Sequence, residues 1–207
     1  MANKSLKPRS KPLPGELIAA SRDSNIVMVK NLLAQGADIN EQDEGGGTAL
    51  IWAAVRGDMA MAGFLIAQGA DLNKKTDGGA TALLRAIHQG HSSLALLLIE
   101  QGANIEEQNS AGATALIWAS WHGNGEVVKV LIEKGAELDV KTIFGVTALS
   151  NAIEHGHKNV AKMLEQALTV QEAKAEEARQ KALAEALNPA LRHPLKVKRP
   201  PKLGGRS

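Results

Sequence analysis

The amino-acid sequence predicts an all-α repeat solenoid, in which short helix pairs stack on one another in chain order. Two short motifs recur along the chain, and each returns at intervals of 33 residues. Thr-Ala-Leu begins at Thr48, Thr81, Thr114 and Thr147, and Gly-Ala begins at Gly36, Gly69, Gly102 and Gly135. Two independent motifs with one period indicate a chain built from repeated structural units.

The composition agrees with this fold class. Of the 207 residues, 44% are apolar but only 2% are aromatic, as expected for closely stacked short helices rich in alanine and leucine. The absence of cysteine excludes disulfides and thiol chemistry and fits a reducing compartment. Apolar runs such as residues 94–99 are far shorter than the roughly 18 residues of a membrane span, and no signal peptide is expected. We therefore expect a cytoplasmic protein, with the nucleus or transfer into a host cell as alternatives.

The formal net charge of +2 conceals basic ends and an acidic middle. Residues 1–13 carry +4 and residues 189–207 carry +6, in both cases without an acidic residue, so residues 14–188 carry −8. Because both ends are also rich in proline, we expect a flexible basic arm at 1–13 and a disordered basic tail at 189–207. The ends are interpreted as solubilising termini, as docking segments for an acidic protein or for the acidic body, or as contacts for nucleic acid.

Within the repeating part, each unit is expected to contain two short helices followed by an extended loop. In the second unit, Thr48 is placed to cap the first helix and Gly57 to end it. Phe64 and Leu65 belong to the apolar stripe of a second helix, and Gly69 stands where a residue with positive φ closes that helix.

The pattern Gly-x-Thr-Ala-Leu, followed by an apolar helix and Leu-x-x-Gly-Ala, resembles the ankyrin repeat. This resemblance implies a right-handed stack of helix pairs with β-hairpin fingers on one side. It also implies binding of other proteins across a concave face formed by the fingers and the first helices. The array is expected to span residues 14–168 in five repeats, at about 14–42, 43–75, 76–108, 109–141 and 142–168.

The sequence departs from the family pattern in two respects. The usual Thr-Pro-Leu-His lacks its proline and histidine here, so we expect somewhat softer hairpins. Repeat one has Gly15 in place of the threonine and Ser24 in place of the glycine between its helices, which is typical of a terminal, capping repeat.

After the repeats, residues 169–188 are rich in alanine, glutamate, lysine and leucine, which are strong helix formers. They predict a C-terminal helix that continues the last helix of repeat five or folds back as a cap. Pro189 ends it.

Catalytic and cofactor motifs are absent. The sequence has no Walker A motif, no Gly-x-Ser-x-Gly and no His-Glu-x-x-His. The glycines at 45–47 and 78–79 are interpreted as finger turns rather than a phosphate cradle, because no Lys-Ser/Thr follows them. We therefore expect neither enzymatic activity nor a cofactor.

The histidines fall into two groups. His88, His122 and His155 end the first helices of successive repeats, but an expected spacing of about 10 Å is too wide for metal ligation near 2.1 Å. No metal site is therefore expected. His91 and His157 each follow a glycine between helices, where we expect a structural role.

Three tryptophans stand out in a chain with few aromatic residues. Trp52 and Trp118 share one repeat position, with Arg85 at that position in the repeat between them. We interpret this row as structural, with Arg85 placed to lie against the indole faces as a cation–π contact. Trp121 instead ends the first helix of repeat four, at a position where family members commonly vary.

The finger that follows Trp121 in the chain carries apolar side chains at 143–146 where the other fingers have polar or small residues. Either it packs on the C-terminal helix, or it forms a partner-binding hot spot with Trp121. The candidate partner-binding residues are Arg56, His88, Gln89, Trp121, His122, Ile143, Phe144, Val146 and His155.

The sequence therefore favours a non-enzymatic scaffold, a monomer that binds a protein partner through its concave, finger-side surface. Two alternatives stay open: a regulatory or inhibitory subunit of an enzyme, and a microbial effector that acts on a host protein. Contact of the basic ends with nucleic acid is a further alternative.

Overall fold

Residues 12–187 are the part of the chain that the computed structural model describes. This part forms ten helices and no β-strand, which confirms the predicted all-α class. The predicted basic tail, and all but the last two residues of the predicted basic arm, lie outside it. In chain order the helices are α1 (Glu16–Arg22), α2 (Ile26–Ala34), α3 (Ala49–Arg56), α4 (Met59–Ala67), α5 (Ala82–His88), α6 (Ser92–Glu100), α7 (Ala115–Trp121), α8 (Gly125–Glu133), α9 (Ala148–Glu154) and α10 (Lys158–Leu187).

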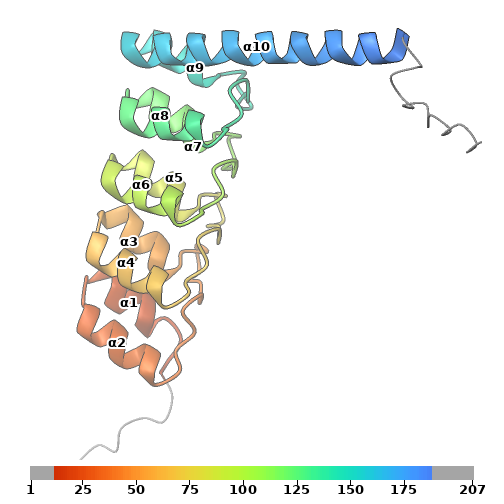
Figure 1. Ribbon diagram of the computed structural model, residues 1–207. Helices are drawn as coiled ribbons and strands as arrows, with labels where there is room; N and C mark the ends of the chain where they lie inside the picture. Colours follow the sequence, from red (N-terminus) through yellow and green to blue (C-terminus); the bar gives the residue numbers. More distant parts are fainter. Residues whose placement is uncertain (1–11, 188–207) are drawn as a thin grey trace, which may run out of the picture. The chain divides into compact units, whose positions relative to one another are not determined.

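Within residues 12–167, the helices form five pairs that are stacked in chain order (Figure 1). The first helices pack on one another in the order α1, α3, α5, α7 and α9, and α2, α4, α6 and α8 each pack on the first helix of their own pair. The loops that join one pair to the next lie on one side of the helices. Each repeat thus contacts its neighbours, as expected for a solenoid.

The core repeats because equivalent positions are buried in successive units. Leu50, Leu83 and Leu116 occupy one position of the first helix and are almost inaccessible to solvent. Burial of such a side chain stabilises the fold by roughly 1.5–3 kcal/mol. Three residues later the position is held by alanine, and Ala53 and Ala86 are fully buried. The small side chain lets neighbouring first helices approach closely.

Threonine caps begin the first helices of repeats two to five. The Thr48 hydroxyl accepts a hydrogen bond from the backbone N–H of Ile51, as the sequence predicts. Thr81, Thr114 and Thr147 accept equivalent bonds. Because such a cap satisfies a free N–H of the first turn, its loss costs about 1 kcal/mol.

The fingers are short turns rather than the expected β-hairpins. They lie at residues 43–47, 76–80, 109–113 and 142–146. In the second, the Thr76 N–H donates to the Ala80 carbonyl, and this bond is too isolated to form a strand ladder. The fingers are also joined to one another, because the Asp77 N–H donates to the Gly45 carbonyl. Equivalent bonds link the later fingers.

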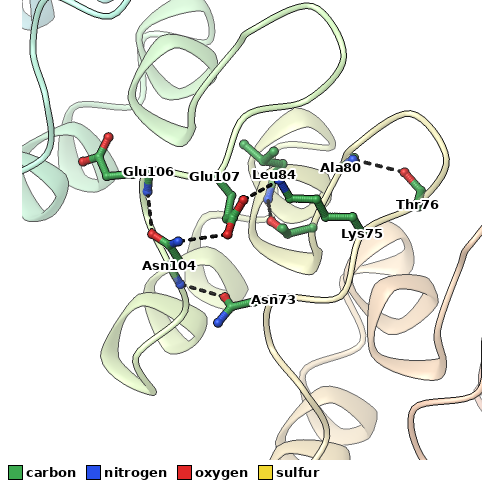
Figure 2. Close-up of polar contacts among 9 residues, drawn as sticks. Asn73, Lys75, Thr76, Ala80, Leu84, Asn104, Glu106 and Glu107 are labelled. Atoms are coloured by element: carbon green, nitrogen blue, oxygen red, sulfur yellow. Dashed lines mark hydrogen bonds and ion pairs between the residues drawn. The ribbon is translucent and has the colours of Figure 1, made fainter.

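A ladder of side-chain bonds ties together the loops that follow the second helices (Figure 2). Asn73 Oδ1 accepts from the Asn104 backbone N–H at 2.8 Å, and Asn104 Oδ1 accepts from the Glu106 N–H. Glu107 accepts from the Asn104 amide and forms an ion pair with Lys75. Because the bonds from Asn73 and Lys75 cross from one repeat to the next, they help to hold adjacent loops in register.

Repeat one departs from the others at the two positions that the sequence indicates. Gly15 precedes α1 with a φ of +82°, and its N–H donates to the Glu41 carboxylate. Ser24 has a φ of +55°, the only positive value among the non-glycine residues between 12 and 187. A side chain in this left-handed region costs about 1–2 kcal/mol.

Helix α10 runs without interruption for 30 residues. Its first part, up to residue 167, belongs to the repeat array and buries Val160 and Leu164. Residues 168–187 belong to a second unit, in which the side chains at 169–186 are exposed. A capping role for this segment stays a prediction. None of the helices in the described part combines the length and apolar character that a membrane crossing requires.

Candidate functional site

Ring side chains from three successive repeats form one continuous group along α5, α7 and α9. His88 meets Trp118 edge to face, with centroids 4.6 Å apart, and Trp118 meets Trp121 at 5.8 Å. Trp121 in turn meets His122 at 4.6 Å and His155 at 5.4 Å. Edge-to-face contacts are favourable because the ring edge is positive and the ring face is negative. We call these five residues the ring cluster.

The ring cluster is partly open to solvent. Trp121 is 39% exposed, His88 and His155 are exposed, and Trp118 and His122 are half-buried. Burial lowers the pKa of His122, and the neighbouring histidines lower it further, against a hydrogen bond with the His88 backbone that raises it. The neutral form of His122 is therefore favoured. The cluster presents an aromatic surface with a largely apolar centre.

His91 and His157 have the structural role that the sequence predicts. The Nε2 atom of His91 lies 3.2 Å from the Val55 carbonyl oxygen, and that of His157 lies 3.0 Å from the Trp121 carbonyl oxygen. Each ring also covers the left-handed glycine at the end of the preceding first helix. A Cβ atom on Gly57 would lie 2.6 Å from Nδ1 of His91. His157 thereby fixes the end of α7, the helix that carries Trp121.

The last finger presents large apolar side chains on a fixed backbone. Ile143 is 71% exposed and Phe144 is 79% exposed, whereas Val146 is half-buried. The Ile143 N–H donates to the preceding finger, and Thr142 Oγ1 accepts from the N–H groups of Phe144 and Val146. Exposed apolar residues of this size mark candidate interaction sites.

The cation over the first tryptophan is not the expected one. The Arg22 guanidinium lies 4.2 Å from the ring centre of Trp52, whereas Arg85 stacks on neither Trp52 nor Trp118. The prediction of a cation–π contact by Arg85 was therefore wrong. The reason is that side chains in contact across two repeats are separated by 30 residues rather than by the repeat length of 33. His88 contacts Trp118 in this way, and Arg22 contacts Trp52.

This offset arises because a side chain in the last turn of one first helix leans across to the next repeat. The residue 30 positions before Arg85 is Val55, which has no ring and is too short to cover its neighbour. A hollow of about 310 Å³ lies here, between repeats two and three. Residues that line it include Asp43, Trp52, Val55, Thr76, Arg85 and Gln89.

Asp43 ties the first finger to α3. Its Oδ2 accepts from the Trp52 indole N–H at 2.7 Å, and its Oδ1 accepts from the N–H groups of Gly45 and Gly47. Burial favours a higher pKa for Asp43, but these donors and the charge of Arg22 outweigh it and hold the pKa below its ordinary value. Because the two glycine N–H groups are occupied, this finger is a turn and not a phosphate cradle.

The structure distributes the nine candidate residues over three places and leaves one apart. The ring cluster contains His88, Trp121, His122 and His155. The last finger contains Ile143, Phe144 and Val146. Gln89 lines the hollow, and Arg56 is exposed at the end of α3, outside all three places. Sequence reasoning missed Trp118 as a member of the cluster, and Asp43 altogether.

The described residues contain no arrangement of side chains that could bind a metal ion. No group of three or more His, Cys, Asp or Glu side chains between residues 12 and 187 is arranged to hold a metal ion. The rings of His88 and His122 are 6.4 Å apart, and other ring contacts surround each of them.

The comparison with known proteins agrees with the geometry. No curated protein matches the sequence. The sequence profile of the family described as "Ankyrin repeats (3 copies)" matches residues 17–109 and 101–173, which is most of the chain and nearly all of the stacked helix pairs. The chain therefore belongs to the ankyrin repeat family.

Proposed function

We propose that this chain is a non-enzymatic module that binds another protein through the ring cluster and the last finger. Ankyrin repeats generally mediate protein–protein interaction, which supports the general role. The observation that carries the location is the exposure of Trp121, Ile143 and Phe144 in repeats four and five. Aromatic side chains at the centre of an interface often supply most of its binding energy.

The rigidity of the supporting elements also favours this surface. Trp121 lies on a helix whose end is held by His157, and Phe144 lies on a turn closed by Thr142. Side chains on such fixed backbones lose less conformational freedom on binding than side chains on mobile loops, so more of the contact energy appears as affinity.

The test is affinity capture with the full chain, followed by mass spectrometry and calorimetry with each captured protein. Trp121→Ala and Phe144→Ala are each expected to weaken binding about 30-fold, which corresponds to roughly 2 kcal/mol. Val27→Ala is the matched control, because Val27 is a 66% exposed apolar side chain on α2, outside both groups. Phe144→Ala and Val27→Ala should keep their melting temperature nearly unchanged, because both side chains are largely exposed. Trp121→Ala is expected to melt at a lower temperature, because it also loses its ring contacts.

Full affinity in both Trp121→Ala and Phe144→Ala would refute the proposal, as would an equal loss in Val27→Ala. The identity of the captured protein separates the open alternatives. An enzyme whose activity changes on binding indicates a regulatory or inhibitory subunit, and a protein of a host organism indicates an effector. Sedimentation analysis of the chain alone tests whether it is a monomer.

A further inference from the structure

The hollow between repeats two and three contains an arginine that forms no ion pair with the described residues. Arg85 is half-buried, and no carboxylate between residues 12 and 187 forms an ion pair with it. Asp43 also lines the hollow, but its oxygens already accept hydrogen bonds from Trp52 and from the finger. A cation that is partly removed from water without a partner is poorly solvated, so an added anion gains unusually strong attraction.

The hollow exists because of one short side chain. At the equivalent place in the preceding interface, Arg22 covers Trp52, and in the following interface His88 covers Trp118. Val55 stands where those two longer side chains stand, and it leaves the side of Arg85 open. Among the interfaces between described repeats, only the one between repeats two and three has a short side chain, Val55, at the position from which Arg22 and His88 reach the next repeat, and a charged side chain, Arg85, at the position that would be reached.

The unpaired guanidinium of Arg85 favours an anionic occupant, and the acidic body favours a small one. Arg22, Arg56 and Arg85 all lie on the first helices of repeats one to three, although residues 14–188 together carry −8. A long polyanion such as nucleic acid would be repelled by that body. A single carboxylate on a protein surface meets Arg85, the arginine that lines the hollow, without bringing a large opposing charge. The volume of about 310 Å³ accommodates one side chain.

We propose that this hollow receives an aspartate or glutamate side chain of the bound protein, and that its carboxylate pairs with the guanidinium of Arg85. The planar guanidinium offers parallel N–H donors that match the two oxygens of a carboxylate. Gln89 lines the same hollow and supplies an amide donor beside it. This inference rests on the proposed function, since it assigns a chemical group to the partner.

The position of the hollow relates it to the ring cluster. Gln89 lines the hollow, and the residue before it, His88, begins the ring cluster. The hollow and the ring cluster therefore meet in the sequence at the end of α5. A partner that places an acidic residue next to an apolar anchor fits both at once.

The inference is tested by two-dimensional NMR of the full chain, with acetyl-glutamate N-methylamide as the probe. Trp52 lines the hollow, so its indole N–H signal reports on occupancy, and Trp52→Phe identifies that signal among the three tryptophans. We expect a saturable shift of this signal with the glutamate derivative. The glutamine derivative, at equal ionic strength, should cause none.

Arg85→Gln is expected to weaken the response at least about tenfold, whereas Arg56→Gln should leave it unchanged, because Arg56 is an exposed arginine outside the hollow. Equal shifts with both derivatives, or an undiminished shift in Arg85→Gln, would overturn the inference. So would stronger binding of inorganic phosphate than of the glutamate derivative at the same signal.

The outcome is separable from that of the proposed function. A saturable shift that requires Arg85 supports the hollow as a carboxylate site even where Trp121→Ala leaves partner binding intact, which refutes the proposed surface. Conversely, loss of partner binding in Trp121→Ala, together with no response to the glutamate derivative, supports the surface and refutes the hollow.

Discussion

Gly123 and Gly90 form a matched pair for measuring what an imidazole contact contributes to the joint between two repeats. Both follow a first helix with a left-handed φ, +67° and +78°. A Cβ atom on Gly90 meets nothing within 4 Å, whereas one on Gly123 would overlap the ring of His157. Gly90→Ala therefore costs only the backbone conformation, about 1–2 kcal/mol.

Gly123→Ala has to displace the His157 ring as well. It then loses the contact between Nε2 and the Trp121 carbonyl, 3.0 Å apart. That hydrogen bond contributes about 1 kcal/mol, and the overpacking costs about 1–3 kcal/mol. The total loss for Gly123→Ala is expected to be about 3–6 kcal/mol, so its excess over Gly90→Ala is about 2–4 kcal/mol.

The assay is urea unfolding followed by circular dichroism, with thermal melts in parallel. The excess corresponds to a melting temperature lower by roughly 4–16 °C than that of Gly90→Ala. In a His157→Ala background, Gly123→Ala should cost no more than Gly90→Ala, and the difference gives the coupling energy of the pair. Equal losses for Gly90→Ala and Gly123→Ala in the otherwise natural chain would refute the reasoning.

The remaining predictions concern three other residues. Ser24→Gly is expected to raise the free energy of unfolding by about 0.5–1 kcal/mol by removing a side chain from the left-handed region, and a decrease on urea unfolding would contradict this strain. Ser120→Ala should raise it by about 1 kcal/mol, since the buried hydroxyl of Ser120 has no hydrogen-bond partner among the described residues; a measured loss would show that the hydroxyl is satisfied. Burial lowers the pKa of His122, so on acidification the unfolded chain binds this proton at a higher pH than the folded chain does. The contribution of His122 to the free energy of unfolding is therefore present above the ordinary pKa of 6.5 and is lost as the pH falls through the lowered pKa. The melting temperature of the natural chain should therefore drop more than that of His122→Gln between about pH 7.5 and pH 5.5, and parallel curves would argue against it.

The helices are predictable from the sequence because their determinants are local. Thr48 and its equivalents cap a helix through a bond to a residue three positions away, and a glycine such as Gly57 ends it. The same residues recur every 33 positions, so each inference is supported several times over. His91 and His157 are predictable for the same reason, since each follows a glycine in an inter-helix loop.

The contacts between repeats are harder to predict because they depend on the direction in which long side chains extend toward the next repeat. Alignment of the repeats places Arg85 in the same row as Trp52, yet the actual neighbour of Trp52 is Arg22, one helical turn out of register. The hollow was missed for a related reason. Its existence depends on the length of Val55 relative to the Arg22 and His88 side chains at equivalent places, which is a comparison between interfaces rather than a motif.

The surface residues lie between these two cases. Trp121, Ile143 and Phe144 stand out in the sequence because they replace the small or polar residues of other repeats. Their exposure agrees with the proposed surface. What the sequence does not contain is their grouping: Trp121 belongs to the ring cluster, whereas Phe144 makes none of the ring contacts found between residues 12 and 187.

The direct bonds from one finger to the next have a consequence for distance. Because every finger is joined to its neighbour at the same backbone positions, the separation between two features of the array depends on how many repeats stand between them. Adjacent helices lie about 10 Å apart, so each additional repeat increases the separation between two features of the array by about that distance. Insertion of one 33-residue unit between repeats three and four would move the hollow about 10 Å further from Trp121 and the last finger. A partner that spans both would then no longer fit, although the hollow, Trp121 and the last finger would each stay intact. The contacts of His88 with Trp118 and His122 cross the insertion point and would be lost.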